Sequence, residues 1–248
     1  MSAELGTLAF EARRGDRAAF VILLVVAAAI FAFGLFIAVE GEPIALLPAV
    51  AVGGVVGLAA IMGRMHRIDV YQNGLSVRQL GSRAALRWDD IEHMQWRVVK
   101  KSVNGIPVGT YVWAHLNGPR GKATINLRLA GQLAQDMDGL RSFLTERLGA
   151  RALQSVQNGQ VFSWGKTAHV QLSREGISLK KNLAFGLFYG GRTTVAWTTP
   201  LQFAIADGYC SIYDPGAKRT LVTFGCDEPD FYPGFWVFTR MAQSLVGG

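Results

Sequence analysis

Two uncharged apolar stretches lie close together near the start of the 248-residue chain. The first covers residues 18–39 and the second covers residues 43–63. Each has about the 20 residues that an α-helix needs to cross a hydrocarbon core of about 30 Å. A secretory signal has a shorter apolar region of about 7–15 residues, and a helix buried in a soluble bundle usually carries polar residues on one face. We therefore expect two transmembrane helices joined by a short turn.

Basic residues flank the two predicted spans on the side away from the turn. They are Arg13, Arg14, Arg17, Arg64 and Arg67. The turn contains no basic residue, and short segments rich in Lys and Arg stay on the cytoplasmic side of a membrane. We expect a multi-pass protein of the cytoplasmic membrane with both termini in the cytoplasm, the N-terminal one as segment 1–17.

Small residues recur at every fourth position of the second predicted span, at Ala45, Ala49, Gly53 and Gly57. Such a stripe allows another helix to approach closely. We expect the first span of the same chain to be the partner, with dimerisation as the alternative.

The sequence after Arg64 has alternating polarity in short stretches, which is typical of half-buried β-strands. Leucines at helical spacing follow, and Gly149 is the expected end of that helix. Strands and one helix are expected again later, with Asp230 at the position of an N-cap. We predict a first domain at 64–150, a linker at 151–160 and a second domain at 161–248.

Two short motifs occur in both predicted domains. Residues 73–77 (NGLSV) match residues 175–179 (EGISL), and residues 85–88 (ALRW) match residues 194–197 (TVAW). Similarity at a separation of about a hundred residues favours two copies of one domain over a solenoid of short repeats.

These motifs resemble the bacterial pleckstrin-homology-like (PH-like) domain, through the Gly-containing turn, the sequence Trp-Asp-Asp-Ile at 88–91 and the closing helix. The whole order, from Leu5-Gly6 to residues 159–162, is similar to an uncharacterised bacterial family of membrane-anchored proteins with two such domains. The resemblance implies a fold and a topology and no established activity. In the second copy, residues 197–201 (WTTPL) replace the acidic turn, and the stretch 180–192 looks longer than usual. The expected fold class is an α-helical transmembrane hairpin followed by an α+β region of two PH-like β-barrels or sandwiches, each closed by a C-terminal helix.

The chain contains His, Cys and Asp residues, which often act in catalysis or bind metals. They do not occur at the spacing that such sites need. The four histidines, His66, His93, His115 and His169, do not occur at ligand spacing, and Cys210 and Cys226 are expected to remain thiols. Asp89-Asp90 is the one carboxylate pair. We interpret it as a turn, since Asp bonds readily to nearby backbone in turns, with metal binding or acid–base catalysis as the alternative. We predict no catalytic, cofactor-binding or metal-binding residue.

A net charge of +7 favours an anionic partner. No helix is dense in Lys or Arg and no aromatic stacking motif is present, so nucleic acid is disfavoured as that partner. The segment 180–192 combines basic residues at its ends with apolar residues between them, and we predict that it contacts anionic lipid headgroups or a membrane protein partner. The alternative is that its apolar residues pack between the two domains. The predicted contact residues are Lys180, Lys181, Phe185, Leu187, Phe188 and Arg192.

The function expected from these features is that of a non-catalytic membrane protein. Its two cytoplasmic domains would form a platform that binds a protein or lipid. The alternative is a membrane-bound enzyme with an unrecognised site between the domains. Transport is disfavoured because the predicted spans contain no ionisable residue.

Overall fold

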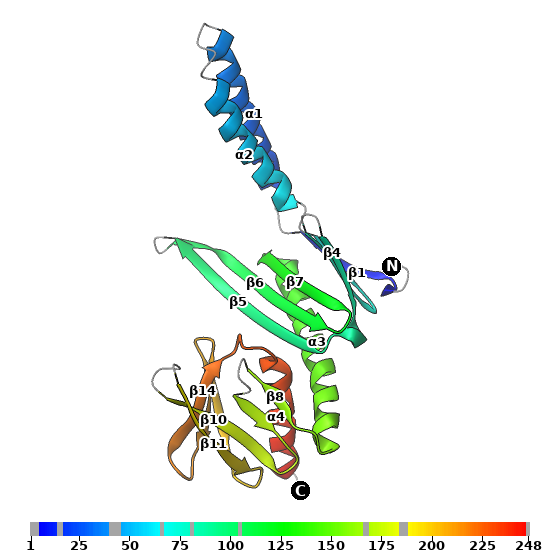
Figure 1. The fold of residues 1–248 in the computed structure, drawn as a ribbon, viewed down its shortest axis with the longest axis vertical. Coiled ribbons are helices and arrows are strands. Elements are labelled where there is room, and N and C mark those ends of the chain that lie inside the picture. The colour runs from blue at the N-terminus through cyan, green and yellow to red at the C-terminus, as the bar shows by residue number, and fades with distance from the viewer. Residues whose placement is uncertain are drawn as a thin grey trace. The chain divides into compact units, whose positions relative to one another are not determined.

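The computed structural model describes residues 5–13, 17–39, 46–64, 67–79, 82–103, 106–165, 169–183 and 188–246. The chain divides into two compact units. Unit 1 contains Met1–Arg87 and Ile125–Arg128, and unit 2 contains Trp88–Thr124 and Leu129–Gly248. An apolar N-terminal helix is followed by mostly antiparallel sheets and a C-terminal helix (Figure 1), which confirms the α+β class.

Unit 1 contains an apolar helical pair, α1 (Arg17–Val39) and α2 (Leu46–Arg64). In α1, only 6% of the apolar segment Phe20–Val39 is buried, unlike the core helix of a soluble protein. Among the described residues, this segment alone is long and apolar enough to cross a membrane by length and composition. The apolar part of α2 that the structure describes, Leu47–Leu58, is shorter.

The two helices contact each other through the predicted stripe of small residues. A Cβ atom added to Gly53 would lie 3.3 Å from the carbonyl oxygen of Ala27 and 3.9 Å from Cγ2 of Ile30. The same addition at Gly57 would meet nothing within 4 Å, and Ala45 lies outside the described residues. At Gly53, therefore, the prediction that the stripe packs against α1 is confirmed.

A strand precedes the helical pair, and sequence reasoning missed it. Strand β1 (Leu8–Arg13) pairs antiparallel with β2 (Arg67–Tyr71), and β3 (Gly74–Gln79) and β4 (Ser82–Arg87) complete a sheet of order β1-β2-β3-β4. Leu8 lies opposite Tyr71, and Arg13 lies opposite Arg67. The helices α1 and α2 are therefore an insertion between two neighbouring strands of one sheet.

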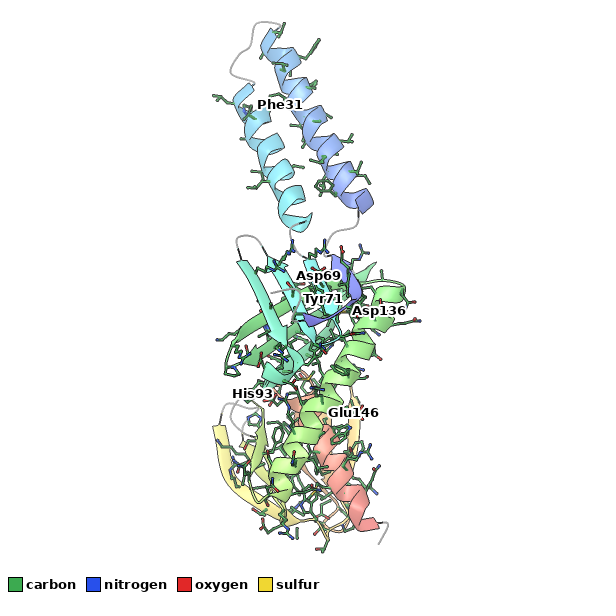
Figure 2. The ribbon with its side chains drawn as sticks, turned by 90° about the vertical axis from the view of Figure 1, so that its right-hand side faces the viewer. Phe31, Asp69, Tyr71, His93, Asp136 and Glu146 are labelled. Carbon is green, nitrogen blue, oxygen red and sulfur yellow. The ribbon has the colours of Figure 1, made fainter. Side chains whose placement is uncertain are left out.

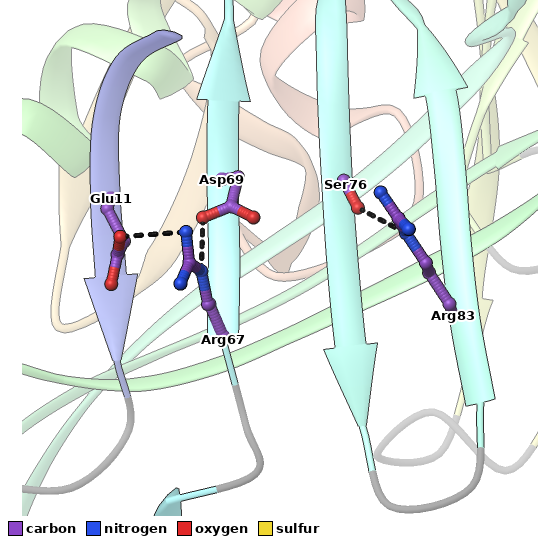
Figure 3. A network of polar contacts seen from close by, with 5 residues as sticks. All are labelled: Glu11, Arg67, Asp69, Ser76 and Arg83. Atoms are coloured by element: carbon purple, nitrogen blue, oxygen red, sulfur yellow. Dashed lines mark hydrogen bonds and ion pairs between the residues drawn. The ribbon is translucent and has the colours of Figure 1, made fainter. Parts of the chain in front are cut away.

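Arg67 of β2 forms one ion pair with Glu11 of β1 and one with Asp69 of its own strand (Figure 3). Its Nε lies 2.6 Å from Oδ1 of Asp69, and its Nη2 lies 2.9 Å from Oε2 of Glu11. Asp69 is only 1% exposed, and a carboxylate at this depth needs a charged partner to offset its lost hydration. Arg67 supplies that partner, so the pairing of β1 with β2 is stabilised by side chains as well as by backbone hydrogen bonds.

Unit 2 contains the remaining elements, apart from residues 125–128 of β7. The turn η3 (Trp88–Asp90) leads into β5 (His93–Val103), β6 (Ile106–Gly118) and β7 (Gly121–Leu129), which form a sheet of order β5-β6-β7. Helix α3 (Gln132–Gln157) follows.

The sheet β11-β10-β9-β8 consists of β8 (Phe162–Trp164), β9 (Val170–Leu172), β10 (Gly176–Leu183) and β11 (Phe188–Ala196). The sheet β12-β13-β14 consists of β12 (Gln202–Ala206), β13 (Tyr209–Asp214) and β14 (Arg219–Gly225), and α4 (Phe231–Val246) ends the chain's described elements.

A four-stranded sheet, a three-stranded sheet and a helix thus occur in the same order twice along the chain. The two matching glycines occupy the same register position: Gly74 opens β3 opposite Arg87, and Gly176 opens β10 opposite Ala196. A Cβ atom would lie 2.3 Å from a carbonyl oxygen of the facing strand at Gly74, and 2.2 Å from one at Gly176. Only glycine fits at either position without a shift of the backbone.

Each matching tryptophan packs on the helix that follows its sheets. The Trp88 ring lies edge-on to Phe143 of α3, with centroids 5.6 Å apart, and the Trp197 ring is tilted against Phe238 of α4 at 6.0 Å. Such aromatic contacts add to the free energy gained from burying apolar area.

Helix α3 does not end at Gly149, so that prediction is wrong. Gly149 is buried, and a Cβ atom there would lie 2.6 Å from Cε3 of Trp236 in α4, so this glycine permits close approach of the two helices. Ala150–Leu153 are good helix formers, and Ala152 and Val156 belong to a buried core. Residues 151–157, most of the predicted linker, are the last two turns of α3.

That core fills the region between α3, α4 and the sheets from β8 to β14. Its aromatic members make edge contacts, for example between Trp164 and Phe224 and between Phe224 and Phe231, both at 5.9 Å between centroids. The helix that was expected after Asp230 is confirmed as α4.

The register position of Gly176 gives a test of the sheet β8–β11. We expect Gly176→Ala to lower the free energy of unfolding by about 1–3 kcal/mol, because the new methyl group must push the facing backbone away. Denaturant unfolding of the full chain in detergent micelles measures this change.

Gly191→Ala is the matched control, because Gly191 lies in the neighbouring strand β11 and an added Cβ atom meets nothing within 4 Å. We expect this variant to unfold within about 0.5 kcal/mol of the wild type, as exposed substitutions usually do. Equal losses in both variants would contradict the register described for β10 and β11.

Candidate functional site

The predicted contact segment 180–192 is described only in part. Lys180 in β10 lies opposite Arg192 in β11, where Lys180 is half-buried and Arg192 is exposed. Phe185 and Leu187 lie outside the described residues, as do the side chains of Lys181 and Phe188. The structure therefore brings two of the basic residues to facing positions, and the role of this segment stays a prediction.

A groove of about 820 Å³ lies elsewhere in unit 2, in a place that sequence reasoning missed. Four segments line it: β5, α3, the turn between β12 and β13, and the segment that leads into α4. Aromatic side chains contribute to its wall, and Tyr209 is 58% exposed. The charged lining residues are Arg97, Lys100, Asp138, Arg141, Asp207 and Asp227.

Most of these charges are paired inside the groove. Arg97 Nε lies 3.3 Å from Oδ2 of Asp227, and Arg141 Nη2 lies 2.5 Å from Oδ1 of Asp138, one turn away on α3. The Arg141 guanidinium also lies 5.0 Å from the ring centroid of Tyr232, a favourable cation–π distance. Lys100 and Asp207 make no ion pair with any other residue that the structure describes. The groove therefore offers one cation, one anion and an aromatic wall to a ligand.

Asp230, next to the groove residue Phe231, holds the start of α4 against β5. Its Oδ1 accepts a hydrogen bond of 2.9 Å from the Met94 N–H, and its Oδ2 lies 2.6 Å from His93 Nδ1. Its own N–H donates to the Met94 carbonyl oxygen at 2.7 Å. Gln95 and Arg97 extend this junction by contacting Asp227. Figure 2 shows where His93 lies on unit 2.

The predicted N-cap position of Asp230 is confirmed for its backbone and wrong for its side chain. The Asp230 carbonyl oxygen accepts the first helical bond, from the Gly234 N–H at 2.9 Å. Its φ of 58° turns the carboxylate away from the helix and toward β5. Burial raises the pKa of this carboxyl, and the bonds from Met94 and His93 oppose that rise in part.

The groove contains one sulfur nucleophile, Cys226, in an environment that does not activate it. Burial raises the pKa of its thiol, and burial raises the pKa of the neighbouring Cys210 thiol to about 12. A reactive cysteine needs the opposite shift, because the thiolate is the nucleophile. Burial likewise raises the pKa of Tyr232. Groups of three or more His, Cys, Asp or Glu that could hold a metal do not occur among the described residues. This arrangement is suited to non-covalent binding.

The Asp89-Asp90 pair lies on the turn η3, as the turn interpretation predicted. Its two carboxylates engage different arginines: Asp89 forms an ion pair with Arg147, and Asp90 lies 3.6 Å from Nη1 of Arg120. Arg151 donates to the Asp89 carbonyl oxygen at 2.9 Å. These contacts connect the turn to α3 and to the loop before β7, which is a structural role.

Removing the Asp230 carboxylate should weaken unit 2. We expect Asp230→Ala to lower the free energy of unfolding by about 1–3 kcal/mol, because the buried Met94 N–H loses its acceptor. Asp230→Asn keeps an acceptor oxygen and should lose less. Denaturant unfolding of both variants against the wild type measures the difference.

The difference in stability between Asp230→Asn and the wild type should change with pH in one direction. Because the pKa of Asp230 is raised in the folded chain, the stability from its protonated form is present at low pH and is lost as the pH rises through the raised value. The Asn variant does not titrate, so its stability relative to the wild type should increase with pH. A constant difference across this range would contradict the buried, shifted carboxyl.

Comparison with known proteins identifies the family of the chain but not its function. No curated protein matches the chain at a significant level. The model of a family of unknown function, DUF6585, matches residues 1–186, which include every element from β1 to β10. The match leaves out the groove residues contributed by the β12–β13 turn and by the start of α4. Because the match covers three quarters of its length, the chain belongs to the DUF6585 family of proteins of unknown function.

Proposed function

We propose that this protein is a non-catalytic, multi-pass membrane protein. Helices α1 and α2 anchor it, both termini lie in the cytoplasm, and two PH-like domains form a platform that binds a protein or lipid partner. The observation that carries this proposal is the pairing of β1 with β2 on the two sides of the helical insertion.

Strand pairing restricts how the chain can cross a bilayer. Strands β1 and β2 exchange backbone hydrogen bonds, so residues 13 and 67 must lie on the same side of the membrane. An even number of crossings between them is then required. If α1 crosses, α2 must return, and its 19 residues extend about 28 Å, close to the thickness of a hydrocarbon core.

A cleaved signal peptide is a poor alternative for α1. Cleavage after α1 would also release β1, and the edge of the sheet β1–β4 would lose its strand and the Glu11–Arg67 ion pair. The exposed apolar surface of α1 also favours lipid as its surroundings. Phe33 is 66% exposed and Phe36 is 60% exposed, a heavy cost for a helix in water. The basic flanks favour the cytoplasmic side for both ends, because short segments rich in Lys and Arg usually stay there.

The order of the sheets and helices supports two PH-like domains. Each would contain a four-stranded sheet, a three-stranded sheet and a closing helix, with the membrane hairpin inserted between the first two strands of the first domain. The equivalent register of Gly74 and Gly176, and the contact of each following tryptophan with a closing helix, support the same assignment.

The chemistry of the groove supports binding over catalysis. Its thiol is kept protonated by burial, most of its charges are consumed in ion pairs, and its wall is aromatic. A site with an activated nucleophile or a converging acid and base would instead have favoured the membrane-bound enzyme.

Cysteine labelling in a bacterial host tests the proposed topology. Single cysteines are introduced by Ser2→Cys, Gly41→Cys and Gly248→Cys after Cys210 and Cys226 are changed to Ala. We expect a membrane-impermeant maleimide to label only the Gly41→Cys variant in intact cells, and the other two only after permeabilisation.

The intact mass of the purified protein, and its sedimentation with membranes without detergent, are the controls. External labelling of the Ser2→Cys variant would mean a single crossing, and loss of the first helix from the mature chain would mean a cleaved signal. Recovery of the intact chain in the supernatant would reject the membrane anchor itself.

A further inference from the structure

Four arginines occupy one row across the whole sheet β1–β4. Arg13 lies opposite Arg67, Arg67 opposite Arg78, and Arg78 opposite Arg83. Directly opposite residues of an antiparallel pair share one face of the sheet. The neighbouring row, Ala12, Ile68, Val77 and Ala84, is apolar and lies on the other face. The arginine row therefore lies on the face of the sheet opposite to the face that carries the apolar row.

The arginines of this row differ in their partners. Arg67 is paired with Glu11 and Asp69, as Figure 3 shows. Within the part of the chain that the structure describes, Arg83 reaches only the neutral Ser76 hydroxyl, which accepts from its Nε at 3.4 Å. The Arg78 side chain is exposed and makes no hydrogen bond or ion pair with any other residue that the structure describes. The β3–β4 end of the row thus carries two positive charges without a carboxylate.

This arrangement is unfavourable for the sheet alone. Like charges directly opposite each other on neighbouring strands are destabilising, and Arg78 faces an arginine on both sides. An anion placed over Arg78 and Arg83 would remove the repulsion. Arginine suits a phosphate in particular, because its guanidinium can donate two parallel hydrogen bonds.

Chain connectivity places the row beside the membrane if α1 and α2 span it. Arg67 comes three residues after Arg64, the last residue of α2, so it lies within about 11 Å of the helix end. Arg13 comes four residues before Arg17, the first residue of α1. The headgroup layer of each leaflet is about 5–8 Å thick. The register then extends the row from β1 to β4 over about 14 Å.

We propose that the arginine row, through Arg78 and Arg83, is a docking site for the phosphates of anionic lipid headgroups. This inference rests on the proposed membrane anchor and adds a lipid preference to it. The row aligns the sheet β1–β4 with the membrane surface, and lipid phosphate replaces the carboxylates that Arg78 and Arg83 lack.

The test compares lipid binding by the wild type, Arg78→Gln/Arg83→Gln and a control, Arg174→Gln/Lys218→Gln. Arg174 and Lys218 are exposed in turns of unit 2, so the control makes the same change in net charge away from the row. Each full chain is purified in a neutral detergent and offered mixed micelles of phosphatidylcholine and phosphatidylglycerol. The retained lipid is then measured by mass spectrometry.

We expect the wild type and the control to retain phosphatidylglycerol preferentially. The double Gln variant should lose roughly 25-fold in affinity, taking about a fivefold contribution from each basic residue next to an anionic surface. Equal preference in all three proteins, or none in the wild type, would overturn the proposal. So would displacement of the lipid by inorganic phosphate at equal concentration, which would indicate a site for free phosphate.

Two further measurements keep the result interpretable. Flotation with phosphatidylcholine vesicles tests the anchor alone, and it should be the same for all variants. Failure of the wild type to float would reject the membrane anchor, whereas normal flotation without a phosphatidylglycerol preference would reject only the arginine site. If the double Gln variant does not fold, Arg78→Gln alone decides, because Arg78 has no described partner to lose.

Discussion

The antiparallel pairing of β1 with β2 is the constraint on which the rest of unit 1 depends. Two strands that exchange backbone hydrogen bonds must share one aqueous compartment, whatever the chain between them does. The 53 residues between Arg13 and Arg67 can therefore leave that compartment only by returning to it. The ion pair between Glu11 of β1 and Arg67 of β2 lies at this junction, and Arg67 also balances the buried charge of Asp69 within β2.

The strongest sequence feature, two uncharged stretches, predicted the helices α1 and α2, because twenty apolar residues in a row have few alternatives. Strand β1 could not be found in the same way. Its six residues, Leu8–Arg13, stand alone before the first helix, and their pairing with β2 is what identifies them as a strand. Its partner lies beyond the two helices, and sequence patterns do not report contacts over that separation.

The two errors near the helix ends have the same physical origin. Gly149 resembles a helix stop locally, yet Trp236 from a distant segment needs the space that a side chain would take. Asp230 resembles an N-cap locally, yet its carboxylate bonds to the Met94 N–H of β5. In both cases a tertiary contact decided the role of a residue whose local preference indicated another. The groove was missed for the same reason, because its lining converges from segments far apart in the sequence.

Two pairs of residues show how a register position explains, or fails to explain, the residue found there. Gly74 and Gly176 each lie against a carbonyl oxygen of the facing strand, so their presence follows from the packing of the sheets. Arg78 and Arg83 face each other without a carboxylate, so the folded chain alone does not account for them. A residue that stabilises the fold is explained by its neighbours, whereas Arg78 and Arg83 together raise the energy of the isolated sheet. If α1 and α2 span a bilayer as proposed, lipid phosphates at its surface would supply the balancing charge.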